Sequence, residues 1–242
     1  MKIPLIYVPR TKYKYFLEIN KKYRSEKYII PIGRDCHAAH SLDILNIREQ
    51  SLPYDWIRLK PILGLQIVSN NIKEKFKYFL QDLKKNEEGN TYAEKYPNAE
   101  FTHAKAVLDN PDLRKTFEKR CKRLLDLIGS KPVAYLYILE IDDFKGSEDV
   151  DFFYDTVIGF TEILKPTDSL HIYIRFDETV EENPEICKQL IDKIQPVNQV
   201  FITSYIREKE KYGIWGNEKA YPQLYKSLNL DIKQIFPKIL IK

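Results

Sequence analysis

A cysteine at the start of a predicted helix is the feature of the sequence with the clearest chemistry. Residues 28–45 read YIIPIGRDCHAAHSLDIL: an apolar run, a glycine turn, and a helix whose first turn holds Cys36. Asp35 can cap this helix, and the unpaired N–H groups and positive dipole end at a helix start favour a negatively charged sulfur. Cys36 is therefore the strongest candidate nucleophile. The alternative is a small buried cysteine that only packs.

A thiol nucleophile needs a base, and the chain has only four histidines: His37, His40, His103 and His171. His40 lies one helical turn after Cys36 on the same face, so it could contact a substrate or be structural. His103 follows a long loop, and this placement favours it as the base. His171 lies in an apolar strand and is predicted to be structural. Cys36, His40 and His103 lack the second compact ligand pair of a metal motif, so no metal is expected.

Asp55 and Trp56 follow a proline and form a second candidate element. The Asp55 carboxylate could orient a catalytic histidine or Arg34. Alternatively, Asp55 caps a helix and Trp56 packs in the core. We predict Asp55 as the third catalytic residue beside Cys36 and His103, with six residues binding substrate: Arg34, Asp35, His40, Trp56, Arg120 and Arg123.

A long helix is predicted from Asn110, which caps it, and Pro111, which takes its first position. An apolar stripe of this helix includes Cys121, so Cys121 is predicted to be buried and inert. The other face is basic and is expected to be solvated. Arg120 and Arg123 on that face could nevertheless bind a phosphate or carboxylate group, because a guanidinium can contact such groups at two points.

Three blocks of the sequence carry a resemblance to a known family. They are the run 32–39 (IGRDCHAA) followed by 52–57 (LPYDWI), the segment from Phe101-x-His103 to Phe117-x-x-Arg120-x-x-Arg123, and Trp215-Gly216. These blocks resemble the uncharacterised family described as papain-like cysteine peptidases, which shows a Gly-x-x-Cys turn and a Pro-aromatic-Asp-Trp element. The resemblance implies a nucleophilic Cys36 and matches His103, Arg120 and Arg123 to its second block. The chain departs from the family by carrying Arg34 and Asp35 where small or polar residues usually precede the cysteine.

Composition sets the broad class. The chain has 242 residues, of which 43% are hydrophobic and 31% charged, so residues 1–242 are expected to form a single α/β domain that is soluble. No run is long enough to span a membrane, and no signal peptide is recognised. Three widely spaced cysteines fit the reducing cytoplasm. A net charge of +4 with interspersed signs does not indicate nucleic acid, and no cofactor is expected.

The hydrophobic pattern predicts the architecture. Strands are expected at 3–8, 28–32, 133–140, 170–176 and 199–206, and helices at about 71–85, 149–164 and 184–194. Strands that alternate with helices predict a mostly parallel, Rossmann-like sheet with helices on both faces. The family resemblance implies a papain-like α+β fold instead. The turn-rich stretch 86–100 is expected to be a mobile loop. Cys36 would lie beyond the carboxyl end of a strand, where ligands bind in open α/β sheets.

Three functions are consistent with these features. The first is a thiol-dependent hydrolase or acyl transferase acting on a small-molecule, peptide or glycan substrate. The second is a glycan- or phosphoester-handling transferase in which Arg34, Arg120 and Arg123 hold an anionic donor such as a sugar nucleotide. The third is a binding protein without catalysis. Dinucleotide-binding, P-loop and serine-hydrolase glycine motifs do not occur in the sequence.

Overall fold

The centre of the computed structural model, which describes residues 2–10, 14–178 and 184–241, is a sheet of four parallel strands. The strands run in the order β10-β9-β8-β3, and every adjacent pair is parallel. Their bounds are Tyr28–Pro31 (β3), Val133–Leu139 (β8), Ser169–Asp177 (β9) and Val200–Arg207 (β10). Helices α4 (Ser147–Thr161) and α5 (Pro184–Ile194) join the last three strands. The predicted succession of strands and helices after Val133 is therefore confirmed.

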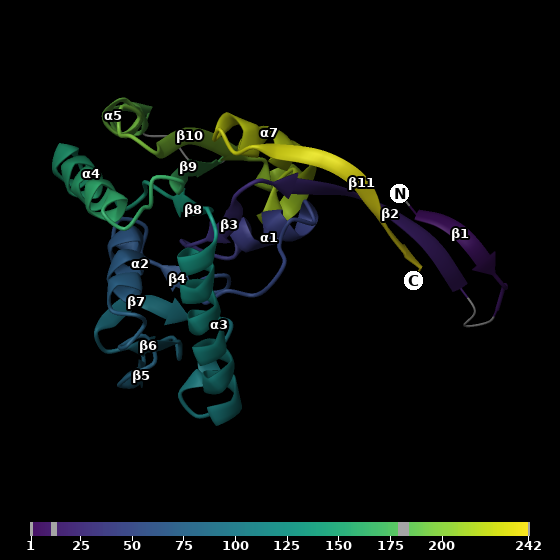
Figure 1. Ribbon diagram of the computed structural model, residues 1–242, viewed down its shortest axis with the longest axis horizontal. Helices are drawn as coiled ribbons and strands as arrows, with labels where there is room; N and C mark the ends of the chain where they lie inside the picture. Colours follow the sequence, from purple (N-terminus) through teal and green to yellow (C-terminus); the bar gives the residue numbers. More distant parts are fainter. Residues whose placement is uncertain (1, 11–13, 179–183, 242) are drawn as a thin grey trace.

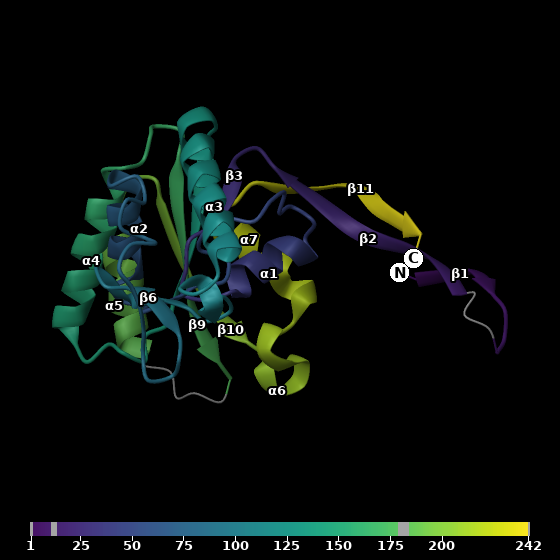
Figure 2. The ribbon, with the colours of Figure 1, turned by 90° about the horizontal axis from the view of Figure 1, so that it is seen from below.

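Helices cover both faces of this sheet (Figures 1 and 2). All seven residues of β8 are buried, as expected for a strand packed on two sides. Alternate residues such as Tyr137 point to a core shared with α2 (Gly64–Lys73), α3 (Pro111–Ser130), α4 and α5. The intervening residues, such as Leu136, belong to a second core with α1 (His37–Ile44) and α7 (Tyr221–Ser227). The strand period of two thus creates two cores.

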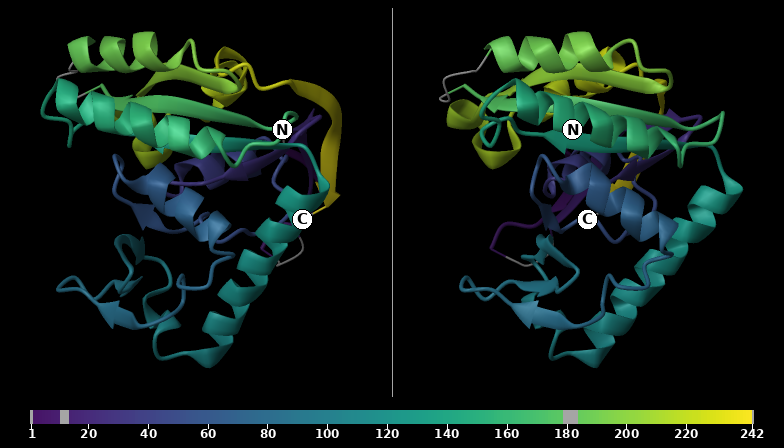
Figure 3. Two further views of the ribbon diagram at one scale, coloured as in Figure 1. Left: turned by 60° about the vertical axis from the view of Figure 1, so that its left-hand side comes forward. Right: turned by 90° about the vertical axis from the view of Figure 1, so that its left-hand side faces the viewer.

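Two further sheets are antiparallel, so the parallel arrangement predicted for most of the chain holds only for the central sheet. One is an arm that projects from the body and carries both ends of the chain (Figures 1 and 2). Its strands are β1 (Lys2–Tyr7), β2 (Lys14–Ser25) and β11 (Ile232–Ile241). The other sheet has the order β4-β7-β6-β5, with bounds Arg58–Leu59 (β4), Leu83–Lys85 (β5), Thr91–Ala93 (β6) and Tyr96–Phe101 (β7). Helix α3 begins beside this small sheet and ends at the parallel sheet (Figure 3).

The expected loop at 86–100 is largely an antiparallel hairpin. A turn joins β5 to β6: the Asn86 N–H donates to the Asn90 carbonyl at 3.0 Å, and the Asn90 N–H donates to the Asn86 side-chain Oδ1 at 2.9 Å. Strand β6 in turn pairs with β7. The turn residues suggested a loop because they are all polar, whereas the strands they connect are only three to six residues long.

The helix predicted at 71–85 is also wrong, because α2 ends at Lys73. Lys75 and Phe76 have φ angles of 52° and 59°, and the Phe76 N–H donates to the Asn71 carbonyl at 2.7 Å. Left-handed residues after the last turn terminate a helix in this way. Phe76, Phe79 and Leu80 are buried as a helical stripe would be, but they lie in successive turns. Apolar spacing predicted their burial and not their backbone.

Short segments complete the chain. They are the 3₁₀ turns η1 (Lys105–Val107), η2 (Gly213–Trp215) and η3 (Glu218–Ala220), and the single-turn helix α6 (Lys209–Tyr212). Among the described residues, no helix combines the length and the apolar character needed to cross a membrane.

Candidate functional site

A network of ion pairs lies at the carboxyl edge of the parallel sheet. Arg175, near the end of β9 and only 4% exposed, donates to both carboxylate oxygens of Asp35 at 2.6 and 3.2 Å. It also binds Glu140, which follows β8, and Arg34 donates to the second oxygen of Glu140 at 2.5 Å. Parallel strands end at the same edge, which is why residues 34–35, 140 and 175 meet. The pairing lowers the pKa of Asp35 to about 2, although burial alone would raise it.

Cys36 lies beside this network, directly before the first residue of α1, and is partly buried. Burial raises the pKa of its thiol, and the Asp35 carboxylate adds to the effect; Arg175 and Arg207 oppose it. The expectation that the helix start would lower this pKa is therefore wrong. Desolvation and an adjacent negative charge outweigh the helix terminus. These surroundings therefore favour the thiol over the thiolate.

His37 is held in a buried cage and is not available as a base. Its Nδ1 lies 2.8 Å from the Tyr173 hydroxyl and its Nε2 3.2 Å from the Trp215 carbonyl oxygen. A carbonyl only accepts, so Nε2 carries the hydrogen and Nδ1 accepts from Tyr173. Burial, with Arg175 nearby, lowers the pKa of His37 to about 3, so the ring stays neutral.

His40 has the setting of an oriented base. Its ring stacks on Trp215 with a centroid distance of 3.8 Å and an interplanar angle of 18°. Its Nε2 lies 2.9 Å from Oε1 of Glu218. Nε2 therefore donates to the carboxylate in the neutral ring, which leaves Nδ1 as the basic nitrogen. His40 lies one helical turn after Cys36, and its backbone N–H donates to the Cys36 carbonyl at 2.9 Å, so the two residues share one face of α1.

The structure places His103 and Asp55 in a different cluster. His103 is exposed just after β7 and meets Trp56 edge-on, with ring centroids 5.7 Å apart. Asp55 is fully buried, and its Oδ2 accepts from Arg48 at 2.5 Å and from the Leu52 N–H at 2.9 Å. Asp55 thus orients an arginine and not a histidine or Arg34. Trp56 is half-buried, and the Arg48 guanidinium lies over its ring, 6.0 Å from the ring centroid.

Arg120 and Arg123 lie next to this second cluster. Both are half-buried on α3; Arg123 donates to the Ser51 carbonyl at 2.6 Å, and Arg120 lies over the Phe117 ring at 4.8 Å. Burial lowers the pKa of Arg120; the Asp55 carboxylate raises this pKa, and the Arg48 guanidinium lowers it. Of the nine predicted site residues, the structure therefore brings four together at Cys36 and four at Trp56, with Asp55 buried beneath the latter group. The first four are Arg34, Asp35, Cys36 and His40; the second four are Trp56, His103, Arg120 and Arg123.

The structural roles predicted for two other residues are confirmed. His171 is buried in β9, with Nδ1 2.7 Å from the Leu228 carbonyl oxygen and Nε2 2.7 Å from the Ser169 hydroxyl. Cys121 is buried in the α3 stripe, and burial raises its pKa. Within the described ranges, no group of three or more His, Cys, Asp or Glu side chains is placed to hold a metal ion.

Four residues of the site were not predicted from the sequence: Glu140, Arg175, Glu218 and the packing role of Trp215. Glu140 and Arg175 occur near the ends of predicted strands, and this position could have identified them. Glu218 lies 178 residues after His40 in a short turn. No local pattern signals such a long-range contact.

No protein-family model, curated protein or solved structure matches the chain.

Proposed function

We propose that the protein is a thiol-dependent hydrolase or acyl transferase in which Cys36 is the nucleophile and His40 the base. One observation supports this most: His40, one turn after Cys36, is fixed by Glu218 at Nε2 and by Trp215 on its ring face. A nucleophile, a base and a carboxylate that orients the base form the arrangement used in covalent acyl transfer. His40 thus takes the role that the sequence assigned to His103.

The proposed reaction has two steps. His40 Nδ1 removes the thiol proton as Cys36 Sγ attacks a carbonyl carbon, and the carbon–sulfur bond forms. The bond to the leaving group breaks, and the leaving group takes the proton from His40. Water or another acceptor then gives its proton to His40 as it attacks the thioester carbonyl carbon. The carbon–sulfur bond breaks, the acyl group leaves, and the sulfur takes the proton back from His40, which restores the thiol.

The raised pKa of Cys36 defines how the thiol is activated. A neutral thiol beside Asp35 requires a base during attack, as a serine does, and is not stored as a thiolate. Glu218 stabilises the His40 imidazolium formed in that step. A cavity of about 240 Å³ lined by Arg34, Arg58 and Asp143 lies beside the ion-pair network and is large enough for part of a small-molecule, peptide or glycan substrate.

The alternative of an anionic donor bound at this edge has less support. Arg34 and Arg175 are already paired with Glu140 and Asp35, and Arg207 binds Asp177 at 2.5 and 2.7 Å. Arginines neutralised by carboxylates attract an anion weakly.

We further infer a Rossmann-like relationship for the βαβαβ unit from β8 to β10, although the described parallel strands follow chain order without the reversal of doubly wound sheets. A thiol nucleophile also fits the reducing cytoplasm inferred from the cysteine content.

An activated ester tests the proposal. Incubation with p-nitrophenyl acetate should acetylate Cys36, as detected by mass spectrometry, and release p-nitrophenol. Cys36→Ser should abolish the thioester. His40→Gln should slow acylation by about 10²-fold, which is the usual contribution of a general base.

The matched control is His103→Gln, which should leave the rate unchanged because His103 packs on Trp56. Loss of acylation in His103→Gln with normal acylation in His40→Gln would return the base role to His103. A wild-type protein that is not acetylated at Cys36 would overturn the thiol mechanism.

A further inference from the structure

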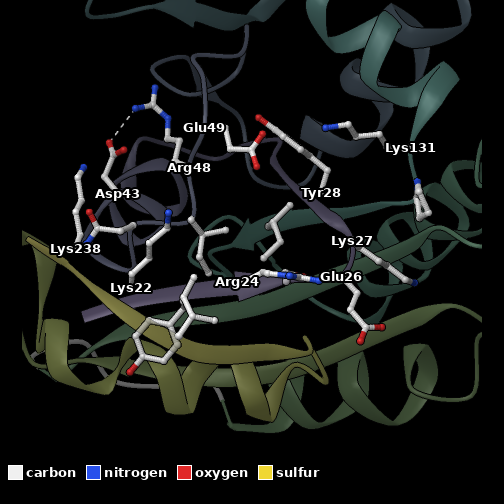
Figure 4. A pocket seen from close by; sticks show the side chains of 17 residues that line it. Lys22, Arg24, Glu26, Lys27, Tyr28, Asp43, Arg48, Glu49, Lys131 and Lys238 are labelled. Carbon is white, nitrogen blue, oxygen red and sulfur yellow. Dashed lines mark hydrogen bonds and ion pairs between the residues drawn. The ribbon is translucent and has the colours of Figure 1, made fainter. Parts of the chain in front are cut away.

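A basic cleft of about 800 Å³ lies where the arm joins the body (Figure 4). One wall is β2 with its neighbour β11, and the other is the loop after α1 together with the turn that follows α3. Tyr28, the first residue of β3, lies between the walls. Cys36 follows the opposite end of the same strand, so the cleft and the proposed thiol site lie at opposite edges of the parallel sheet.

The cleft has an excess of positive charge. Its lining includes six cationic side chains, Lys22, Arg24, Lys27, Arg48, Lys131 and Lys238, and three carboxylates, Glu26, Asp43 and Glu49. Two of the carboxylates are occupied, since Asp43 binds Arg48 at 2.9 Å and Glu26 binds Lys233 at 3.2 Å.

Five of these cations form no ion pair with a carboxylate in the described part of the chain: Lys22, Arg24, Lys27, Lys131 and Lys238. Lys27 is bound instead to the Ser169 hydroxyl, to which its Nζ donates at 3.0 Å, so four cations have no side-chain partner of this kind. Their charges come from both walls, as Figure 4 shows for Lys22 and Arg24 below and Lys131 above. Lys131 lies over the Tyr28 ring at 5.4 Å. Like charges gathered around one cavity repel each other, and a bound anion would relieve that repulsion.

The pairing of β2 with β11 fixes the positions of three of these cations, Lys22, Arg24 and Lys238. Lys22 and Arg24 are two residues apart on β2, so both point to the same face of the arm. The antiparallel pairing sets Lys22 opposite Ile235 and places Lys238 opposite Asn20 on the neighbouring strand. A bulge between Ile235 and Lys238 shifts the register of β11 by one residue. Both residues line the cleft.

We propose that this cleft binds a small molecule carrying two or more phosphate groups. A chain of phosphates carries several charges along its length and can therefore contact cations on both walls at once. The volume lies within the range of small-molecule sites. Asp43, Glu26 and Glu49 interrupt the positive surface, which is unfavourable for the continuous backbone of a nucleic acid.

Calorimetric titration of the full chain with inorganic tripolyphosphate, and in parallel with ATP, tests the proposal. The wild type should bind both. Lys22→Ala and Arg24→Ala should each weaken binding by about tenfold, which is the loss expected for one charge-assisted contact, and the difference should shrink at high salt. Tighter binding of ATP than of tripolyphosphate would identify a nucleotide, and equal binding would identify the phosphates alone.

The control is Lys226→Ala, an exposed lysine on α7 outside the cleft, which should bind as the wild type does. Cys36→Ser should also bind normally, so failure of this proposal is distinct from failure of the thiol mechanism. Absence of binding in the wild type, or equal weakening by Lys226→Ala, would overturn the proposal. Preference for a single-stranded DNA oligonucleotide over both phosphate probes would overturn it in favour of nucleic acid.

Discussion

Arg175 and Asp35 form a two-pronged ion pair, with Nη2 2.6 Å from Oδ2 and Nη1 3.2 Å from Oδ1. The pair joins β9 to the turn after β3, two elements 140 residues apart. Asp35 also accepts from the His37 N–H at 2.9 Å, so the same carboxylate fixes the start of α1. The position of Cys36, directly before α1, therefore depends on the positive charge of Arg175 in β9.

Removing Arg175 should destabilise the fold strongly. Arg175→Met leaves Asp35 and Glu140 close together without their shared cation in a nearly buried site, and the loss of one partner of a buried ion pair costs about 3–5 kcal/mol of unfolding free energy. Urea denaturation measures this loss. Lys122→Ala, which breaks the exposed pair with Asp126, is the control and should change stability by less than about 1 kcal/mol. Equal losses in the two variants would contradict a structural role for the network.

Acidification should destabilise the protein below pH 6.5. Burial lowers the pKa of His37 to about 3 and of His171 to about 4, against 6.5 in the unfolded chain. The unfolded state thus binds more protons, and stability falls with falling pH by up to about 1.4 kcal/mol per pH unit for each histidine. Asp35 acts in the same direction at lower pH, because its contribution is present above about 3.8 and is lost as pH falls toward 2.

Urea denaturation at several pH values between neutral and 4 checks this prediction. His171→Gln removes one of the two titrating rings, so its stability should depend on pH about half as steeply. A wild-type stability that is constant over this range would show that the two rings are not protected from protonation.

Much of the central fold followed from the sequence because it depends on local patterns. Strand and helix periods predicted β8, α4, β9, α5 and β10, and the chain-order sheet follows from connecting them. The arm was only partly predicted: β1 was expected, but its partner β2 was not, and β11, which pairs with the other edge of β2, comes from the other end of the chain. Antiparallel pairing over such a distance leaves no local period to recognise.

The candidate site was predicted in part for the same reason. Cys36 and His40 share one helix, so spacing alone places them on one face. Glu218 and Trp215 reach His40 from a turn near the other end of the chain. His103 illustrates the converse: its position after a long turn favoured function, but its described ring contact is with Trp56.

Gly64→Ala should destabilise the contact between α2 and β8. A Cβ at Gly64 would overlap the hydroxyl of Tyr137, which is fully buried and donates to the Pro61 carbonyl at 2.5 Å. Overpacking of this kind costs about 1–3 kcal/mol. Gly159→Ala is the matched control, since its Cβ meets nothing within 4 Å on α4 and should stabilise by about 0.5–1 kcal/mol. Thermal denaturation of both variants should shift the midpoint in opposite directions.

The cysteines should respond differently to replacement by serine. Cys121→Ser places a hydroxyl in the apolar stripe of α3 and should cost about 1–3 kcal/mol of unfolding free energy. Cys36→Ser changes a partly exposed site with charged neighbours and should leave stability nearly unchanged. Urea denaturation distinguishes the two, and a larger loss for Cys36→Ser would show that Cys36 is a packing residue.

Arg48 should matter because it neutralises a carboxylate that has no access to water. Asp55 is fully buried, its Oδ1 has no hydrogen-bond partner among the described residues, and Arg48 donates to Oδ2 at 2.5 Å. Burial raises the pKa of Asp55, and Arg48 opposes that rise. Arg48→Ala should therefore cost about 3–5 kcal/mol, whereas Arg48→Ala combined with Asp55→Ala should cost less than the sum of the single changes.

The loss in Arg48→Ala should also depend on pH, and its sign follows from the Asp55 carboxyl. Without Arg48 the pKa of Asp55 in the folded protein rises further above its value of 3.8 in the unfolded chain, so the folded state binds more protons than the unfolded state. This term makes the variant's deficit relative to wild type smaller as pH falls from neutral toward the raised pKa. Urea denaturation of both proteins at matched pH values measures the deficit. Two results would show that Arg48 stabilises the loop by packing on Trp56 and not by its charge. One is a stability deficit that does not change with pH; the other is a coupling energy of zero between Arg48→Ala and Asp55→Ala in the double-mutant cycle.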